Sequence, residues 1–272
     1  MKKYSTTNIT KILLTNDDGI SAPGLFYLWE SLKDRGQLTI VAPDKEKSGA
    51  GAGITILKPL RAETVDLYYN TPAWKVGGTP ADCVKLAVTA LLDPPPTLIV
   101  SGINHGSNVG RNIFYSGTIG GVIEGVLRGI PGIAFSYASV ETSTFPHVKS
   151  FIPHIVDYVI KHPLPFGSFL NINFPHVDEG RFQGFKMVRQ GKSFWMEASE
   201  YNIEKGDRHS HYWMHNVCVD YEESDCDTTF LNKGYATVVP IHIHELTDQR
   251  YLSEKKEIFE QQLNRDSLCT FT

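Results

Sequence analysis

The chain has 272 residues, of which 41% are hydrophobic and 21% are charged, and its formal net charge is −4 at pH 7. This length allows one large domain, or one domain with an elaborated extension, around a sizeable core. A slightly acidic chain has no general attraction for polyanions, so we do not expect it to coat nucleic acid, and any anion site must be local.

The first predicted strand is an apolar run at residues 12–14, and it stops at the sequence Asn-Asp-Asp-Gly at positions 16–19. Two adjacent carboxylates, Asp17 and Asp18, repel each other at the end of a buried strand unless a cation or protons compensate. A solvated turn in which Asp18 caps the next helix explains the same residues equally well.

A helix and a second strand follow this turn. Apolar residues recur at helical spacing between Leu25 and Leu32, and a short strand is predicted at residues 38–41. The pattern is a βαβ unit, which favours a parallel sheet. The second strand leads into a basic segment and then into a loop of small residues at 48–53, with glycine at every second position.

The next elements are a hairpin-like excursion at residues 54–76 and a helix that begins at Thr79. Thr79 is expected to cap this helix, and Asp82 is expected to face the positive end of its dipole. The helix should run to about Leu92, where a run of prolines stops it, and a strand follows at residues 97–100.

That strand opens onto a third polar, glycine-rich loop at residues 101–110. Ser116, Gly117 and Thr118 then precede an apolar helix at residues 119–127. A phosphate at the start of this helix would meet free backbone N–H groups and two hydroxyls. An ordinary capped helix start explains the same pattern.

The remaining elements divide into two groups. Strands at 132–136 and 169–174, the second with alternating Asn171 and Asn173, and a helix at 151–160 continue the α/β rhythm. From about residue 175 the rhythm breaks, and we expect an antiparallel extension. Its predicted strands are 185–189, 193–196 and 217–221, followed by a short helix at 228–232, a strand at 234–244 and a surface helix at 247–263.

The three polar loops should meet, because the carboxyl ends of parallel strands lie along one edge of an open sheet and ligands bind there. Asp17, Asp18, Ser48 and Asn104 would then offer two carboxylates, a hydroxyl and an amide carbonyl. These hard oxygen ligands suit Mg²⁺, Mn²⁺ or Ca²⁺. The sequence therefore predicts a metal-dependent phosphate site at this edge.

Five motifs carry a resemblance to a known family: ILLTNDDG at 12–19, VAPD at 41–44 with SGA at 48–50, GTPADC at 78–83, VSGIN at 100–104 and YSGT at 115–118. In order and in spacing they resemble the SurE family of stationary-phase survival phosphatases. The resemblance covers roughly residues 10–136, and the strand after Gly234 resembles the family's C-terminal half more weakly.

The resemblance implies one divalent metal ion, Mg²⁺ or Mn²⁺, held by Asp17, Asp18, Ser48 and Asn104. It implies a phosphate pocket, whose members are Asn16, Asn108, Ser116, Gly117 and Thr118. The implied activity is hydrolysis of nucleoside 5′- or 3′-monophosphates. The chain departs from the family at His105, where a small residue is common, and at Arg111-Asn112, where an acidic one is frequent. The run at residues 51–53 also lacks the Asn-Ser that often follows the SGA motif in the family.

The resemblance also implies the fold class: α/β, a Rossmann-like doubly wound, mostly parallel sheet with a C-terminal antiparallel β extension and a terminal helix. We expect a catalytic core at residues 1–175. Residues 176–272 should supply the β extension, the final core strand and the terminal helix, and should form a homodimer or homotetramer.

The expected reaction is attack of a metal-activated water on a phosphomonoester, with Asp17 or Asp18 accepting the proton. An aspartyl-phosphate intermediate is a variant of this mechanism. His105 is a candidate proton donor to the leaving group. His209, His211 and His215 lie in a polar loop, and His242 and His244 share one strand face, so a zinc site is conceivable, although no carboxylate or cysteine partner is evident.

Two other classes of function remain open. Gly49, Gly51 and Gly53 follow a strand, which suggests a dinucleotide-binding protein, but they do not fit GxGxxG. A nucleotide-binding protein without turnover is the other alternative, and dependence on a metal distinguishes a catalyst from both.

Cysteine use and the start of the chain bear on location. The four cysteines form no CxxC pair, which suits a reducing compartment. Residues 1–10 are polar and only a short apolar stretch follows, so neither a signal peptide nor a membrane span is expected. These features predict a cytoplasmic protein.

Overall fold

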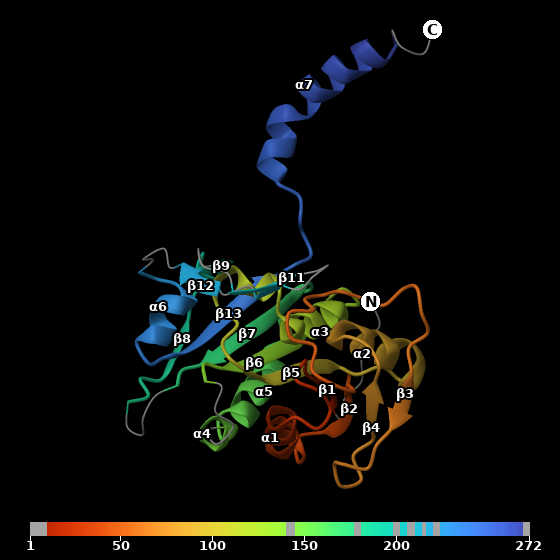
Figure 1. The fold of residues 1–272 in the computed structure, drawn as a ribbon, viewed down its shortest axis with the longest axis vertical. Coiled ribbons are helices and arrows are strands. Elements are labelled where there is room, and N and C mark those ends of the chain that lie inside the picture. The colour runs from red at the N-terminus through yellow and green to blue at the C-terminus, as the bar shows by residue number, and fades with distance from the viewer. Residues whose placement is uncertain are drawn as a thin grey trace.

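The computed structural model describes residues 10–139, 145–176, 181–197, 202–205, 210–213, 216–219 and 224–268. Within these residues the main sheet has nine strands (Figure 1). In spatial order they are β3 (Ala62–Thr64), β4 (Ala73–Val76), β2 (Gln37–Pro43), β1 (Lys11–Thr15), β5 (Leu98–His105), β6 (Gly132–Tyr137), β7 (Ser168–Phe174), β13 (Ala236–His242) and β8 (Phe185–Met187).

The centre of this sheet is parallel, from β4 through β2, β1, β5 and β6 to β7. Antiparallel pairing occurs between β3 and β4 and between β7 and β13, and β8 pairs parallel to β13. The predicted α/β class with a mostly parallel sheet is therefore confirmed. The excursion at 54–76 does form a hairpin-like pair, because β3 returns against β4.

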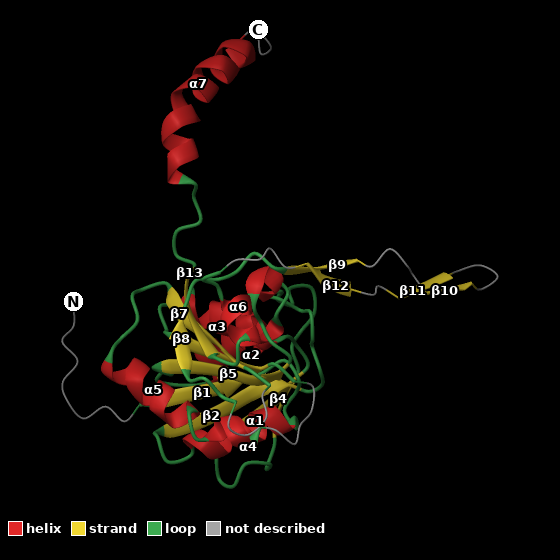
Figure 2. Ribbon diagram, turned by 90° about the vertical axis from the view of Figure 1, so that its left-hand side faces the viewer, coloured by secondary structure: helices red, strands yellow, loops and turns green. Residues whose placement is uncertain are grey.

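Helices cover both faces of the sheet (Figure 2). They are α1 (Pro23–Leu32), α2 (Pro80–Leu86), α3 (Gly117–Val126), α4 (Pro146–Lys149), α5 (Ile152–Lys161), α6 (Asp227–Asn232) and α7 (Gln249–Leu268), with a π-helical turn η1 (Ala87–Leu91) and a 3₁₀ turn η2 (Gly110–Phe114). Helices α1, α4 and α5 pack on one face, and α2 and α3 pack on the other.

The alternation of side chains along β1 explains the two layers. Ile12 and Leu14 pack with Leu28 of α1 on one face, whereas Leu13 packs with Val84 of α2 on the other. Because successive strand residues point to opposite faces, a continuous apolar run fits a strand that is covered on both sides.

The predicted capping of α2 is also confirmed. The Thr79 hydroxyl accepts a hydrogen bond from the N–H of Asp82, and the Asp82 carboxylate accepts one from the N–H of Thr79. The helix continues directly into η1, so its predicted end near Leu92 is correct. The π-helical form of η1 was not predicted.

The C-terminal extension contains two antiparallel ribbons, which project from the body of the protein (Figure 2). One pairs β9 (Phe194–Glu197) with β12 (Asn216–Val219), and the other pairs β10 (Asn202–Lys205) with β11 (Ser210–Trp213). The sequence pattern predicted β9 and β12 but not β10 and β11. Strand β13 then returns to the main sheet beside β7.

The last helix, α7, stands away from the body in both views (Figures 1 and 2). Its side chains are exposed from residue 249 to residue 262, including the apolar residues Tyr251, Leu252, Ile258 and Phe259. Among the described residues, no helix combines the length and the apolar character needed to cross a membrane.

Candidate active site

The carboxyl ends of β1, β2 and β5 border a cleft of about 560 Å³. Its lining includes Asp18, Ser48 and His105, together with residues 19–23 and 44–46. These residues come from the three loops that the sequence analysis expected to converge. The structure thus brings at least two of the predicted metal ligands, Asp18 and Ser48, to one cleft.

Asp17 is the most buried of the predicted ligands, with an exposed fraction of 3%. The Thr118 hydroxyl donates a short hydrogen bond to Asp17 Oδ1. Burial raises the pKa of Asp17 from 3.8 to about 6, and the charge of Asp18 adds to this rise, while hydrogen bonds from the Thr118 side chain and backbone oppose it. The predicted metal site and the predicted phosphate site are therefore in direct contact.

Gly117 makes this contact possible. A Cβ atom at Gly117 would lie 2.7 Å from the Cβ and 2.9 Å from Oδ2 of Asp17, closer than real side chains approach. Ser116 caps the same helix, since its hydroxyl accepts a hydrogen bond from the N–H of Ile119 at 3.2 Å. The first turn of α3 therefore lies directly against the Asp17 carboxylate.

Asp18 faces His105, whose Nδ1 lies 3.3 Å from Asp18 Oδ2. Burial raises the pKa of the Asp18 carboxyl, although His105 acts in the opposite direction. The His105 ring packs against Phe145, with 4.7 Å between the ring centres, and its Nε2 is buried. His105 therefore presents Nδ1, and not Nε2, to the carboxylate.

Two backbone hydrogen bonds hold the glycine-rich loop at residues 48–53, one at Asp17 and one just before α3. The N–H of Lys47 donates to the carbonyl of Asp17 at 2.7 Å, and the N–H of Gly51 donates to the carbonyl of Tyr115 at 3.0 Å. Ser48 lies between these two anchors, exposed, and its hydroxyl donates to Glu46 Oε1 at 2.7 Å. Ser48 is thus near the cleft but turned toward Glu46.

The far end of the same loop is held by Asp82. Its carboxylate accepts hydrogen bonds from the N–H and the hydroxyl of Thr55, at 2.8 and 2.7 Å. Burial opposes ionisation of Asp82, but these bonds and those from Thr79 outweigh it, so its pKa lies below the usual value. The sequence predicts only that Asp82 faces the positive end of the helix dipole, and it does not predict this anchor.

The three asparagines of the predicted site have different surroundings. Asn16 donates to the carbonyl of Gly19 at 3.0 Å and so closes the turn that carries both aspartates. The Asn104 amide nitrogen donates to the carbonyls of His105 and Gly106, at 3.0 and 2.8 Å, so its side-chain oxygen points away from them.

Asn108 is buried and belongs to a polar cluster that the sequence analysis did not connect with the site. Its N–H donates to Asn173 Oδ1 at 2.7 Å, its side chain donates to Ser136 at 2.8 Å, and its carbonyl accepts from Asn171 at 2.8 Å. The alternating Asn171 and Asn173 of β7 were the available signal, because buried amides require partners.

A divalent cation fits the chemistry of these residues. Six buried side-chain oxygens have no hydrogen-bond partner among the described residues, and four of them belong to this edge: Thr15 Oγ1, Asn16 Oδ1, Ser101 Oγ and Asp18 Oδ2, whose one contact is His105 Nδ1 at 3.3 Å. Thr15 and Ser101 are direct neighbours on β1 and β5, and the other two lie in the adjoining turn. Buried oxygens without partners are costly, and a bound cation or its water shell would satisfy them.

The described residues contain no group of three or more His, Cys, Asp or Glu side chains close enough to bind a metal. The predicted ligand set would not form such a group, because only two of its members are carboxylates. His209 and His215, of the conceivable zinc site, lie outside the described residues. His242 and His244 pack on Ser168 and Phe166, respectively.

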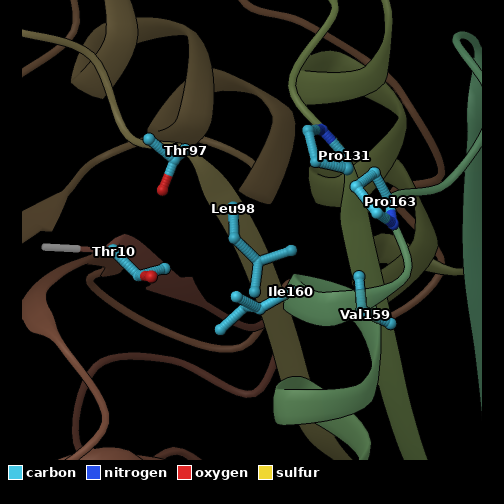
Figure 3. Close-up of a pocket in the computed structure, with 7 residues that line it drawn as sticks. All are labelled: Thr10, Thr97, Leu98, Pro131, Val159, Ile160 and Pro163. Atoms are coloured by element: carbon cyan, nitrogen blue, oxygen red, sulfur yellow. The ribbon is translucent and has the colours of Figure 1, made fainter. Parts of the chain in front are cut away.

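A second cavity, of about 280 Å³, lies at the opposite edge of the sheet, where the strands begin (Figure 3). Its lining is Thr10, Thr97, Leu98, Pro131, Val159, Ile160 and Pro163. These side chains include no acid, base or nucleophile beyond two threonine hydroxyls. This cavity therefore lacks the side chains of an acid–base or metal site.

Comparisons with known proteins are consistent with this arrangement. The family model of Survival protein SurE matches residues 12–197. A protein named 5′-nucleotidase SurE from Protochlamydia amoebophila is 46% identical over 255 residues, covering 93% of this chain and 98% of that protein. Another with this name, from Carboxydothermus hydrogenoformans, is 42% identical over 256 residues, covering 90% and 95%.

The fold has a similar counterpart among solved structures. The crystal structure of the SurE protein from Aquifex aeolicus superimposes with a TM-score of 0.77 at 34% identity. The match covers 91% of this chain and 99% of that one. It therefore includes both the parallel sheet and most of the C-terminal extension.

Proposed function

We infer the activity from one premise: the chain belongs to the Survival protein SurE family, and we propose that it is a 5′-nucleotidase. Its substrates would be nucleoside 5′-monophosphates, with 3′-monophosphates as a second class, and its products a nucleoside and phosphate. The proposed cofactor is one divalent metal ion, Mg²⁺ or Mn²⁺.

One observation carries the proposal: the buried Asp17 carboxylate lies against the first turn of α3, while the adjacent Asp18 opens into the cleft. A cation held by the carboxylates would then lie beside an anion held at the helix start. A phosphomonoester needs both, because its charge must be neutralised and its phosphoryl group must be oriented.

The proposed ligands are Asp17, Asp18, Ser48 and Asn104. When bound, the metal would supply positive charge and lower the pKa of a coordinated water. For Ser48, binding requires its hydroxyl to leave Glu46, which is a rotation of one exposed side chain. Asn104 needs no such change, because its oxygen already points away from the carbonyls that hold its amide nitrogen.

The remaining residues would bind and orient the phosphoryl group. The start of α3 would offer backbone N–H groups and the Ser116 hydroxyl, which can donate while its oxygen accepts from Ile119. The Thr118 hydroxyl now donates to Asp17 and would have to turn to reach a phosphate. Asn16 and Asn108 follow the neighbouring strands β1 and β5. Asp17 or Asp18 would accept the proton of the attacking water.

We also propose that the catalytic core ends near residue 175 and that the following extension joins copies of the chain. Helix α7 supports this, because it stands off the body with Tyr251, Leu252, Ile258 and Phe259 exposed. A lone helix of 20 residues is only marginally stable in water, so a second copy of this chain is the natural partner for its apolar side.

The activity is tested by phosphate release from a panel of nucleoside monophosphates with Mg²⁺, with Mn²⁺ and with EDTA. We expect turnover with metal, its loss with EDTA, and a loss of about a hundredfold or more in Asp17→Asn and Asp18→Asn. Asp225→Asn is the control, since Asp225 is an exposed carboxylate paired with Arg189. Full activity of both site variants, or activity that resists EDTA, would contradict the proposal.

A further inference from the structure

A second buried carboxylate, Asp227 at the start of α6, lies outside the site described above. It has no exposed surface. Its Oδ2 accepts a hydrogen bond from the N–H of Gly110 at 2.9 Å, and its Oδ1 accepts from the N–H groups of Gly191 and Thr228, both at 2.8 Å. One side chain therefore joins three segments that are far apart in the sequence.

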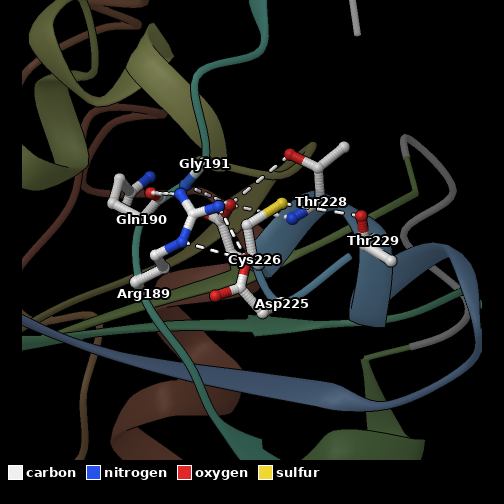
Figure 4. A network of polar contacts seen from close by, with 8 residues as sticks. Arg189, Gln190, Gly191, Asp225, Cys226, Thr228 and Thr229 are labelled. Atoms are coloured by element: carbon white, nitrogen blue, oxygen red, sulfur yellow. Dashed lines mark hydrogen bonds and ion pairs between the residues drawn. The ribbon is translucent and has the colours of Figure 1, made fainter. Parts of the chain in front are cut away.

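The two glycines allow these segments to meet on the carboxylate. Gly110 has a φ of +59°, and a Cβ there would lie 2.2 Å from the carbonyl oxygen of Ser193. A Cβ on Gly191 would lie 2.8 Å from Asp227 Oδ1. Figure 4 shows Gln190 and Gly191 facing Thr228 across this junction. A side chain at Gly110 would therefore collide with Ser193, and one at Gly191 would collide with Asp227.

Further bonds fix Gly110 in the same place. Its carbonyl accepts a hydrogen bond from the Gln190 side chain at 2.6 Å, and the N–H of Arg111 donates to the carbonyl of Ser193 at 2.8 Å. The turn at Gly110 is therefore held on both sides by the C-terminal extension, and Asp227 supplies the charged bond among these contacts.

Gly110 stands between two parts of the proposed phosphate pocket. Asn108 lies two residues before it, and η2 leads from it to Ser116, the cap of α3. Hydrogen bonds to a charged acceptor are stronger than neutral ones, so the Asp227 bond is the strongest restraint on this turn. A shift of Gly110 would move both flanking residues relative to Asp17.

We propose that Asp227 is a positioning residue of the phosphate site: its buried carboxylate fixes the Gly110 turn and thereby sets Asn108 and the start of α3. The proposal rests on the proposed function, because it assumes that these residues bind phosphate. It assigns to the C-terminal extension a role in substrate binding, in addition to any role in joining copies of the chain.

The test compares the full-length wild type with Asp227→Asn, using inorganic phosphate as the probe in the presence of Mn²⁺. We expect the dissociation constant of phosphate and the KM for a nucleoside monophosphate to rise about tenfold. The dissociation constant of Mn²⁺ should rise by a smaller factor, about twofold, because among the described residues Asp17 is linked to this turn only indirectly, through Thr118 at the start of α3. Asp225→Asn, the neighbouring exposed carboxylate, should match the wild type in all three.

Gln190→Ala is the second variant, in case Asp227→Asn does not fold. It removes only the bond to the Gly110 carbonyl, so phosphate binding should weaken in the same direction by about threefold. A lower melting temperature with unchanged phosphate binding in every variant that folds would overturn the proposal and leave Asp227 a structural role. If the wild type neither binds phosphate nor turns over, the proposed function itself fails.

Discussion

The Thr118 hydroxyl donates a hydrogen bond to Asp17 Oδ1, between residues that are 101 positions apart in the sequence. Asp17 lies in the turn after β1 and Thr118 lies in the first turn of α3, so this bond fixes the position of a helix start relative to a strand end. It also determines which carboxylate oxygen remains for a ligand: Oδ1 is engaged by Thr118, and Oδ2 lies beside Gly117.

Thr118→Val should therefore weaken both metal binding and turnover. Valine has nearly the same shape but no hydroxyl, so Asp17 loses a bond to its charged form, worth about 1.5–3 kcal/mol. We expect kcat/KM to fall by about 10- to 100-fold, with partial recovery at high Mn²⁺. Steady-state kinetics across a Mn²⁺ titration measures this. Thr118→Ser keeps the hydroxyl and should retain most activity; equal losses in both variants would assign the effect to packing.

Without metal and above pH 6, the Asp17→Asn variant should be more stable than the wild type. The folded state raises the pKa of Asp17 from 3.8 to about 6, so the folded chain binds a proton that the unfolded chain releases in this interval. The free energy of unfolding of the metal-free wild type therefore falls by on the order of 3 kcal/mol as the pH rises from 3.8 to about 6. Asparagine keeps the acceptor for Thr118 without the charge.

Melting temperatures in EDTA between pH 4 and pH 8 test this prediction, and the difference between the two proteins should vanish near pH 4. Mn²⁺ should then reverse the order at pH 8, because it stabilises only the protein that binds it. A wild type that is the more stable protein in EDTA at every pH would contradict the prediction.

The sequence predicted the sheet, the helices of the core and the loops that meet at its edge, because these follow from apolar periodicity and from strands ending in polar residues. It did not predict how the loops are held. The bonds from Thr118 to Asp17, from Thr55 to Asp82 and from Gly110 to Asp227 join distant segments, and no local pattern encodes such pairs. Strands β10 and β11 were missed because their residues are mainly polar, without apolar alternation.

Gly117→Ala should disable the site although alanine is the better helix residue by about 1 kcal/mol. The added Cβ would lie 2.7 Å from the Cβ of Asp17, so either α3 or Asp17 must move. We expect kcat/KM to fall by about 100-fold, because small displacements at a reacting centre are costly. Gly77→Ala is the control, since the nearest atom to its Cβ would be 3.8 Å away. Equal activity of the two variants would contradict the close contact.

Asp82→Asn should loosen the glycine-rich loop and lower the stability by about 1–3 kcal/mol at neutral pH. The folded state lowers the pKa of Asp82, so its contribution is present above the usual value of 3.8 and is lost as pH falls through the folded value. The difference in unfolding free energy between variant and wild type should therefore shrink below about pH 4. Urea denaturation at pH 7 and pH 3 measures it, and a constant difference would exclude the charged form of Asp82 as the cause.

His105→Ala should reduce the hydrolysis of a nucleoside monophosphate and of p-nitrophenyl phosphate by the same factor, about tenfold. The reason is geometric: Nδ1 faces Asp18 at 3.3 Å and Nε2 is buried, so we expect His105 to orient a carboxylate and not to protonate a leaving group. Because nitrophenolate leaves without a proton, the pair of substrates separates the two roles. The exposed His154→Ala is the control. A general acid contributes about 10²–10⁴-fold, so a loss of that size confined to the nucleotide would instead make His105 the proton donor.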